Sequence, residues 1–427
     1  MLLTLIIIFI LTYAAIALED LLKINKAAVA LIGAGLLWSI YALATANSHL
    51  IDEQLAHSLI GAAQIAFFLM GAMTIVEVID IHNGFDVITK RISAKSLSKL
   101  VWIIAIVTFF LSAILDNLTT TIVMVSLMKK LLSERQDRLL FAGLIILASN
   151  SGGAWSPIGD VTTTMLWIGG QVTSLEVIKG VFLPSLVNML IPATYLSYQL
   201  RGKKVSAPAS NSQSETYQTS PFERNMMFGL GLGILVMVPV FKAVTHLPPY
   251  LGILLGLGIL WAIGDLIHRH KEEPTRKRMA IAHALTRIDM GVIVFFIGIL
   301  LAVATLEHTE ILSMAAQLMD NTVGRLDVIV IILGLVSAVV DNVPIVAASM
   351  GMYSLETHPP DSFLWEFMAY CAGTGGSILI IGSAAGVAAM GLEKISFIWY
   401  LSKYSLLALV AYLAGALTYI GQYYLMH

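Results

Sequence analysis

The chain has 427 residues, of which 58% are hydrophobic and only 12% are charged. Ordinary globular domains are about one quarter charged, so this composition excludes a typical soluble domain and predicts a polytopic membrane protein. The 25 Lys and Arg residues nearly balance the 27 Asp and Glu residues, which argues against nucleic acid as a partner, because phosphate-binding surfaces need a basic excess.

The first half of the chain contains four long apolar runs that predict membrane-spanning helices. Each run is close to the ~20 residues that cross the hydrocarbon core of a bilayer. The chain begins Met-Leu-Leu-Thr-Leu, without the basic start of a secretory signal, so we expect the first run to be a retained span. The four runs lie at 2–18, 27–46, 58–78 and 177–199.

Two further apolar stretches of the first half are interrupted by polar residues. The stretch 99–131 is broken at Asp116 and Asn117, and the stretch 139–170 is broken over 149–160. Helix breaks at membrane depth are tolerated only where the freed backbone groups line a cavity or are buried in protein. These two breaks are therefore the predicted place of a binding site.

A polar linker at 201–225 precedes a second half that repeats the same order of runs. Ser112-Ala-Ile-Leu-Asp116-Asn117 returns as Ser337-Ala-Val-Val-Asp341-Asn342, 225 positions later (341 minus 116). The chain is therefore expected to contain a duplicated unit. The uninterrupted runs of the second half lie at 226–246, 249–267, 289–306 and 397–424, and the interrupted ones at 326–352 and 365–391, the latter broken over 373–383.

The basic residues predict how the chain crosses the membrane. Six segments hold 21 of the 25 Lys and Arg residues and are expected to be cytoplasmic loops: 19–26, 81–101, 129–138, 200–225, 267–289 and 392–396. Both ends of 99–131 are then cytoplasmic, which favours a re-entrant hairpin; the matching 326–352 would enter from outside. Two short full spans remain an alternative for each hairpin, but arms of about 15 residues are short for that.

These crossings predict an all-α protein of two inverted repeats, each with five transmembrane helices, one of them broken, plus a re-entrant hairpin. The repeats are 1–200 and 226–427, and both chain termini are expected outside. Inverted repeats with paired broken helices are typical of secondary transporters that work by alternating access.

The interruptions carry the candidate ion and proton site. An ionised carboxylate inside an apolar segment is costly and marks an ion or proton pathway, and oxygen-rich breaks suit a small cation. Capping of the following half-helix is the competing explanation for each acid, and it is weakened by the recurrence of Asp-Asn in both halves. The candidate residues are Asp116, Asn117, Thr119, Thr120, Asn150, Ser151, Asp160, Thr162, Thr163, Ser337, Asp341, Asn342, Thr374 and Ser377, with Na⁺ placed at Asp116 and Asp160.

Three acidic and imidazole side chains lie near the ends of corresponding spans. Glu77 lies near the end of the third span of the first half, and Glu307 and His308 lie near the end of its counterpart. They are candidate proton-access residues, or else solvated helix ends.

The broken segments resemble those of the NhaD family of sodium/proton antiporters in the ion transporter superfamily. The resemblance rests on Asp116-Asn-Leu-Thr-Thr-Thr, Gly152-Gly-Ala-Trp-Ser-Pro-Ile-Gly-Asp160, Asp341-Asn-Val-Pro and Gly373-Thr-Gly-Gly-Ser. It implies exchange of Na⁺ or Li⁺ for H⁺ across a bacterial inner membrane by a homodimer in the lipid bilayer, with no cofactor beyond the transported ions. It also implies that the ion site is carried by Asp116, Asn117, Asp160, Thr162 and Thr163, with contributions from Ser337, Asn342 and Ser377.

The expected mechanism is competition between the cation and protons for a midplane carboxylate, Asp160 or Asp116. A sodium-coupled symporter of a small anion is the alternative; the apparent lack of Lys or Arg at either break counts against it, because an anion needs a positive partner. An intramembrane enzyme with Asp116 and Asp341 as an aspartyl dyad is disfavoured, so the protein is not expected to be an enzyme.

Overall fold

Apolar runs fold into helices along almost the whole chain. The computed structural model describes residues 1–427 except 46–47, 93, 207–218 and 427, and within those residues the only β pairing is one isolated bridge between Ser96 and Lys204. Eight of the described helices are long and apolar enough to cross a membrane. The chain is therefore a multi-pass membrane protein, as its composition predicts.

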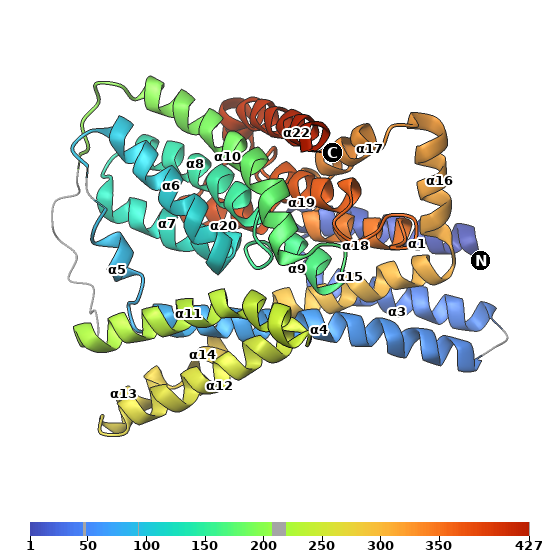
Figure 1. Cartoon of the computed structure of the whole chain (residues 1–427), viewed down its shortest axis with the longest axis horizontal. Helices are drawn as coiled ribbons and strands as arrows, with labels where there is room; N and C mark the ends of the chain where they lie inside the picture. The colour runs from blue at the N-terminus through green and yellow to red at the C-terminus, as the bar shows by residue number, and fades with distance from the viewer. Residues whose placement is uncertain (46–47, 93, 207–218, 427) are drawn as a thin grey trace.

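One layer of helices forms the lower part of Figure 1. Helix α15 packs against α3 and α4, while α12 packs against α4 and α11, and α1 lies on α3. These contacts are made by apolar faces, since buried residues recur along each helix. The bounds are α1 Leu2–Ala17, α3 Lys26–Ala44, α4 Ser48–Ile81, α11 Pro221–Thr245, α12 Pro249–His268 and α15 Met290–His308.

A second layer forms the upper part of Figure 1 and contains all the interrupted segments. Its core is built by α6 on α8, α7 on α8, α17 on α19 and α10 on α22. The bounds are α6 Leu97–Leu115, α7 Asn117–Leu131, α8 Arg135–Ala154, α9 Val161–Ile168, α10 Ser174–Gln199, α17 Leu326–Val336, α18 Asn342–Met352, α19 Phe363–Gly375, α20 Ala384–Glu393 and α22 Leu406–Met426, the last preceded by α21 Phe397–Tyr400 and a π-helical turn Leu401–Ser405.

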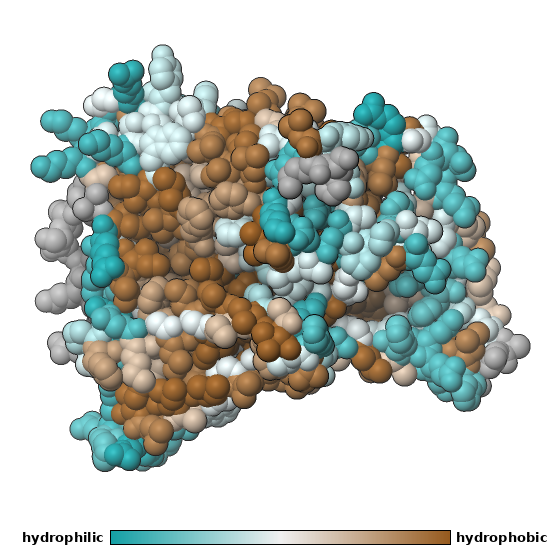
Figure 2. Space-filling view, in the orientation of Figure 1, coloured by the Kyte–Doolittle hydropathy of each residue, from teal (hydrophilic) through white to brown (hydrophobic). Residues whose placement is uncertain are grey.

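The exterior of the molecule is largely apolar, as a lipid-facing surface requires. Figure 2 shows a broad hydrophobic area over the left half of this face, with hydrophilic residues at the left and right margins and a mixed region near the middle. Large side chains such as Leu43, Leu406 and Leu425 are mostly exposed. The two polar margins are separated by the apolar band that a bilayer would cover.

The first hairpin returns to the side from which it enters. The backbone N–H of Leu97, at the start of α6, donates to the carbonyl of Lys203 at 3.1 Å, and the N–H of Ser133, after α7, donates to Ser206 at 2.8 Å. Both ends therefore meet the same connector. One detail differs from the prediction: α6 has 19 residues and is itself long enough to span, because its helix starts two residues earlier than the apolar run and continues to the break.

The second hairpin is built from two shorter helices. Helices α17 and α18 have 11 residues each, and the residues between them, 337–341, form a turn. Both hairpin helices pack on α16 (Ile311–Val323), and the Tyr353 hydroxyl donates to Asp320 of α16 at 3.4 Å. Helix α16 was not predicted, because polar residues are interspersed among its apolar ones and leave no continuous apolar run.

The breaks in the two broken helices are shorter than predicted. Helix α8 continues through Asn150-Ser-Gly-Gly-Ala154, so its break covers 155–160, and α19 continues to Gly375, so its break covers 376–383. Asn150 and Ser151 consequently project from intact helix. The glycines are needed here for close packing rather than for a break: a side chain at Gly152 would overlap the carbonyl of Phe109 in α6.

The same glycine contacts recur in the second half. A side chain at Gly375 would overlap the carbonyl of Gly334 in α17, and Gly159 and Gly382 press in the same way on the backbones of Ala113 and Ala338. The glycines of the two halves are 223 positions apart (375 minus 152), and their partners are 225 positions apart (334 minus 109), which is the offset of the two Asp-Asn motifs. Each hairpin is thus packed backbone to backbone against the broken helix of its own half.

The predicted linker and the basic loops are described only in part by the structure. Of the linker 201–225, residues 207–218 lie outside the described residues, and 221–225 already belong to α11. The basic segment 267–289 carries two short helices, α13 (Glu273–Met279) and α14 (Ile281–Arg287). Two single-turn helices, α2 (Glu19–Leu22) and α5 (Asp86–Thr89), lie in the other loops at this end of the molecule.

Candidate functional site

Each hairpin tip places an aspartate at the start of a half-helix. Asp116 caps α7, where its carboxylate accepts from the Thr119 N–H at 2.8 Å and from the Thr119 hydroxyl at 2.9 Å. Asp341 caps α18 through the N–H of Val343 at 3.4 Å. Capping is therefore real at both tips. Asp116 differs in having a φ of 84°, a region that costs a non-glycine residue about 1–3 kcal/mol and is concentrated at functional sites.

Asp160 is the most enclosed of the three aspartates, with only 2% of its surface exposed. It caps α9: one carboxylate oxygen accepts from the Thr162 N–H at 3.0 Å and from the Thr162 hydroxyl at 2.9 Å. The other oxygen accepts from the Asn117 amide at 2.7 Å. Neutral donors thus surround a carboxylate that no cationic side chain contacts among the described hydrogen bonds, which leaves its charge available to a small cation.

A chain of amide and hydroxyl groups joins the two halves next to Asp160. The Asn117 amide also donates to the side-chain oxygen of Asn150 at 3.0 Å. The Asn150 amide in turn donates to the hydroxyls of Ser377 at 2.8 Å and Ser383 at 2.9 Å. The predicted residues of both broken helices are therefore brought together by Asn150, and Ser383 is an additional member.

A lysine occupies the second hairpin tip. The Nζ of Lys26, at the start of α3, lies 2.7 Å from the Asp341 carboxylate and 4.6 Å from the centre of the Phe295 ring. The expectation that neither break has a Lys or Arg beside it is thus wrong. It failed because Lys26 belongs to the other layer and is distant from Asp341 in sequence.

The three aspartates line one cavity of about 80 Å³ between the two layers, which we call the inner cavity. Lys26, Phe68 and Phe295 face it from one layer, and Asp116, Asn117, Asp160 and Asn342 from the other. The cavity holds only a few small groups, which suits an ion with little of its hydration shell. The lining is otherwise mainly apolar, so charges here are weakly screened.

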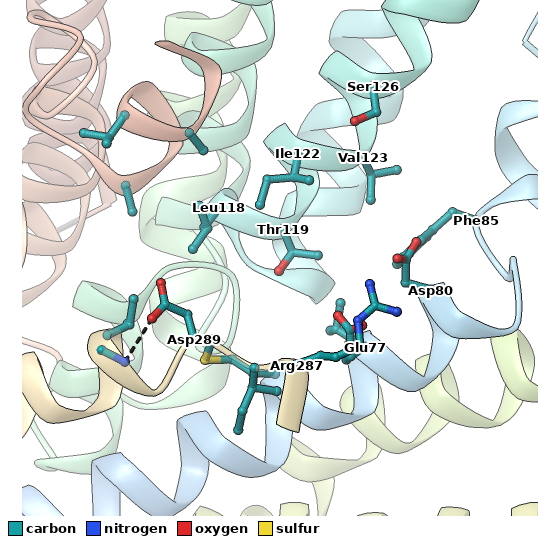
Figure 3. A pocket seen from close by; sticks show the side chains of 18 of the residues that line it. Glu77, Asp80, Phe85, Leu118, Thr119, Ile122, Val123, Ser126, Arg287 and Asp289 are labelled. Carbon is teal, nitrogen blue, oxygen red and sulfur yellow. Dashed lines mark hydrogen bonds and ion pairs between the residues drawn. The ribbon is translucent and has the colours of Figure 1, made fainter. Parts of the chain in front are cut away.

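A larger cavity of about 690 Å³ adjoins the small one and shares Lys26, Met73, Leu118 and Thr119 with it. We call it the vestibule. In Figure 3, Leu118, Thr119 and Ile122 of α7 stand opposite Glu77 and Asp80 of α4, with Arg287 beside Glu77. The Arg287 guanidinium is 2.8 Å from the Glu77 carboxylate. Lys130 also lines the vestibule, so the vestibule lies at the end of the molecule that carries the basic loops.

The other candidate proton-access residues lie elsewhere. His308 ends α15, where its Nε2 is 3.0 Å from the Ser58 hydroxyl and its ring meets the edge of Trp38. Glu307 lies beside Gly351 at the end of α18. Only Glu77 of the three is among the residues that line the two cavities.

Several predicted site residues form local hydrogen bonds and do not contact the aspartates. The hydroxyl of Ser337 donates to the backbone carbonyl of Gly334, that of Thr374 to the carbonyl of Tyr370, and that of Thr163 to the carbonyl of Ala154. Ser151 donates to Leu147 and Asn188. Thr120 is buried, and its hydroxyl has no hydrogen-bond partner in the structure.

The oxygen atoms around Asp160 are hard ligand atoms, the type that small hard cations prefer. Among the described residues no three His, Cys, Asp or Glu side chains are placed to hold a metal ion together. The arrangement at Asp160 is one buried carboxylate with amide and hydroxyl groups beside it.

Comparison with known proteins places this arrangement in a family. The family model described as "Citrate transporter" matches residues 6–373. The chain is 47% identical to sodium/proton antiporter 1 of Arabidopsis thaliana, over 96% of this chain and 70% of that protein. It is 31% identical to the Na(+)/H(+) antiporter NhaD of Alkalimonas amylolytica, over 91% and 83% of the two chains.

The fold also has a solved counterpart. The crystal structure of the YdaH transporter of Alcanivorax borkumensis aligns with a TM-score of 0.60, covering 93% of this chain and 98% of that one at 12% sequence identity. At this identity the likeness concerns the fold alone. The two sequence relatives, by contrast, match 96% and 91% of this chain.

Proposed function

The chain belongs to the citrate transporter family and to its NhaD-type sodium/proton antiporters, and we propose that it exchanges Na⁺ or Li⁺ for H⁺ across the membrane. The observation that carries the proposal is the Asp160 carboxylate, which lies in the inner cavity beside Asn117 with no cationic partner among the described residues. Two relatives named as sodium/proton antiporters support it.

The exchange rests on one carboxylate binding either a cation or a proton. Na⁺ requires ionised Asp160 and neighbouring oxygens. The Thr162 hydroxyl oxygen contacts Asp160 directly, and the Asn150 side-chain oxygen lies next to it, because the Asn117 amide N–H groups donate to both Asp160 and Asn150. A proton on Asp160 removes the charge that attracts the cation. Because the cavity is small and weakly hydrated, the two occupants exclude each other, and proton loss on one side permits cation binding.

Alternating access follows from where the cavity lies. The vestibule opens the inner cavity toward the basic loops, which the positive-inside rule assigns to the cytoplasm. The aspartates belong to one layer and Lys26, Phe68 and Phe295 to the other. Sliding or rocking of one layer against the other would close the vestibule and expose Asp160 to the opposite side. The two halves would then act as inverted repeats.

Transport of a small anion is the second candidate, because the family model that matches the chain is described as a citrate transporter. It would need an unpaired cation in the inner cavity. Lys26 is the cationic side chain there among the described residues, and its ammonium is already paired with Asp341. Three aspartates against one lysine leave the cavity negative, which favours a cation.

The test uses everted membrane vesicles with a preset pH gradient and a fluorescent pH probe. Addition of Na⁺ or Li⁺ should collapse the gradient for the wild-type chain and should not do so for Asp160→Asn or Asp116→Asn. Asp52→Asn is the matched control, because Asp52 is exposed on α4. The proposal would be overturned if the wild type did not respond to Na⁺, Li⁺ or K⁺ at any pH tested. Uptake of labelled citrate in the same vesicles would then indicate anion symport.

Two further features belong to the same proposal. We place the protein in a bacterial inner membrane with both termini outside, and we expect it to work as a homodimer. Cross-linking in native membranes and protease accessibility of tags at the two termini would test these features separately from transport.

A further inference from the structure

The ion pair between Lys26 and Asp341 links the two layers inside the inner cavity. The two atoms, Nζ and Oδ2, are 2.7 Å apart, and the side chains are 26% and 13% exposed. The Phe295 ring lies under the ammonium at 4.6 Å. Such a pair is held by close geometry and weak screening, and removal of one partner leaves the other charge uncompensated.

Acidic groups surround Lys26 from every element packed against it. Glu19 accepts from the Lys26 backbone N–H at 3.0 Å, and Asp289 caps the neighbouring α15. Asp116 and Asp160 share the inner cavity with Lys26, Glu77 and Asp80 share the vestibule, and Tyr13 of α1 adds a neutral hydroxyl near Asp341. Lys26 is the one cationic side chain among the described residues that line the inner cavity.

The first hairpin has no equivalent of this lysine. Lys26 begins α3, and the position 223 residues later, which begins α12, is Pro249. Asp116 is held instead by the neutral groups of Thr119. The two Asp-Asn tips are therefore alike in sequence and different in charge: one aspartate is compensated by a lysine and the other is not.

We propose that Lys26 is a tethered cation that occupies Asp341 and thereby sets the affinity of the exchange site for the transported cation. Its ammonium group occupies the position beside Asp341 that a second Na⁺ would otherwise occupy. Exchange of Na⁺ for H⁺ is then left to the carboxylates of Asp160 and Asp116. Lys26 is in this sense a specificity-determining residue. The inference rests on the proposed Na⁺/H⁺ exchange and deepens it.

The opposite signs of the two charges give a sharp test. In Lys26→Met the uncompensated Asp341 makes the cavity more negative and should lower the apparent KM for Na⁺. In Asp341→Asn the uncompensated Lys26 should raise it. One unit charge at ~10–15 Å in a partly screened medium changes binding by about three- to tenfold. The double variant Lys26→Met/Asp341→Asn should return close to the wild-type KM, and Lys26→Arg should retain it.

The measurement is Na⁺-dependent proton movement in proteoliposomes at one fixed alkaline pH, with KM and kcat obtained separately. Lys179→Met is the matched control, since Lys179 is exposed on α10 and paired with Glu176 on the same helix. The thermal unfolding midpoint of each variant in detergent reports folding. If a single variant does not fold, the double variant and Lys26→Arg still compare a neutral pair with a charged one.

The inference and the function fail in different ways. Changes of KM in the same direction for both single variants, or a double variant whose KM stays shifted away from the wild-type value, would make Lys26 a merely structural residue while exchange itself stands. A wild type without any cation-dependent proton movement would overturn exchange and the role of Lys26 together.

Discussion

Asn117 donates a hydrogen bond of 2.7 Å to the Asp160 carboxylate, and so connects the tip of a hairpin to the break of a neighbouring helix. The two residues are 43 positions apart and both are buried. Because the same amide also donates to Asn150, it holds the carboxylate at a fixed place in the inner cavity. The identity of residue 117 should therefore matter for cation binding as well as for folding.

The first prediction concerns this amide. Asn117→Ala should raise the apparent KM for Na⁺ by about tenfold or more, because a buried hydrogen bond to a charged group contributes about 1.5–3 kcal/mol. The measurement is a Na⁺ titration of gradient collapse in vesicles. Asn321→Ala, on the exposed face of α16, is the control. An unchanged KM would show that Asn117 does not support the cation-binding form of Asp160.

A second prediction separates two members of the polar chain. Asn150→Ala removes the hydrogen bonds to Ser377, Ser383 and Asn117 at once, so it should destabilise the protein by about 1–3 kcal/mol and abolish transport. Ser383→Ala removes one of the two hydroxyl acceptors of Asn150 and the cap on the Gly386 N–H of α20, and it should lower transport slightly. Thermal unfolding in detergent and vesicle transport measure the two effects. An equal loss of transport in both variants would instead indicate that the Ser383 hydroxyl binds the transported cation directly.

The third prediction tests the close packing of hairpin on broken helix. Gly152→Ala and Gly375→Ala both force a methyl group into a backbone carbonyl and should each destabilise the protein by about 1–3 kcal/mol or prevent its accumulation. Gly258→Ala, in α12 with open space around it, should be neutral or stabilising by about 0.5–1 kcal/mol. Protein yield and thermal midpoints decide; tolerance of alanine at both sites would contradict the packing argument.

The fourth prediction uses a buried histidine pair outside the site. His82 donates from Nδ1 to the Val78 carbonyl at 2.7 Å, and its Nε2 is 3.2 Å from Nε2 of His268. Burial lowers the pKa of His82 below its usual 6.5. The unfolded chain then binds a proton that the folded chain does not, so the free energy of unfolding should fall as the pH drops below about 6.5.

His82→Gln should weaken that dependence. Thermal midpoints of the wild type and of His82→Gln, measured from neutral to mildly acidic pH, should converge toward the acidic end. His49→Gln is the control, because His49 is largely exposed. Parallel curves for wild type and His82→Gln would place the acid sensitivity in other groups.

The sequence predicted the helices well because apolar length is a local property. The runs at 27–46, 249–267 and 289–306 became α3, α12 and α15 with shifts of two residues or fewer at their ends. The hairpins and breaks were located for the same reason: Asp116 and Asp341 interrupt apolar segments, and nothing distant in sequence is needed to see it. Helix α16 was not predicted, because its apolar residues do not form a continuous apolar run.

The polar contacts of the site were only partly predictable. Asp160, Asn117 and Asn150 were found one by one from their place at interruptions, but that they touch each other depends on the packing of α7 on α8. Lys26 was misassigned to a loop because a basic residue before a span is what the topology rule requires there in any case. Its partnership with Asp341 is a contact between layers, and no local pattern contains it.

The glycine contacts have a consequence for how access and recognition are divided. Since Gly152 and Gly375 press directly on the backbones of α6 and α17, a hairpin cannot shift against its broken helix without losing contact along a whole turn. In the proposed exchange, Asn117, Asn150 and Asp160 would then move together as one hydrogen-bonded unit, which we call the cage. The spacing of the oxygens in the cage would then be the same in the inward-facing and outward-facing states. The selectivity for one cation over another should therefore be equal on both sides of the membrane. Substitutions that alter the gate should change speed and leave ion preference intact.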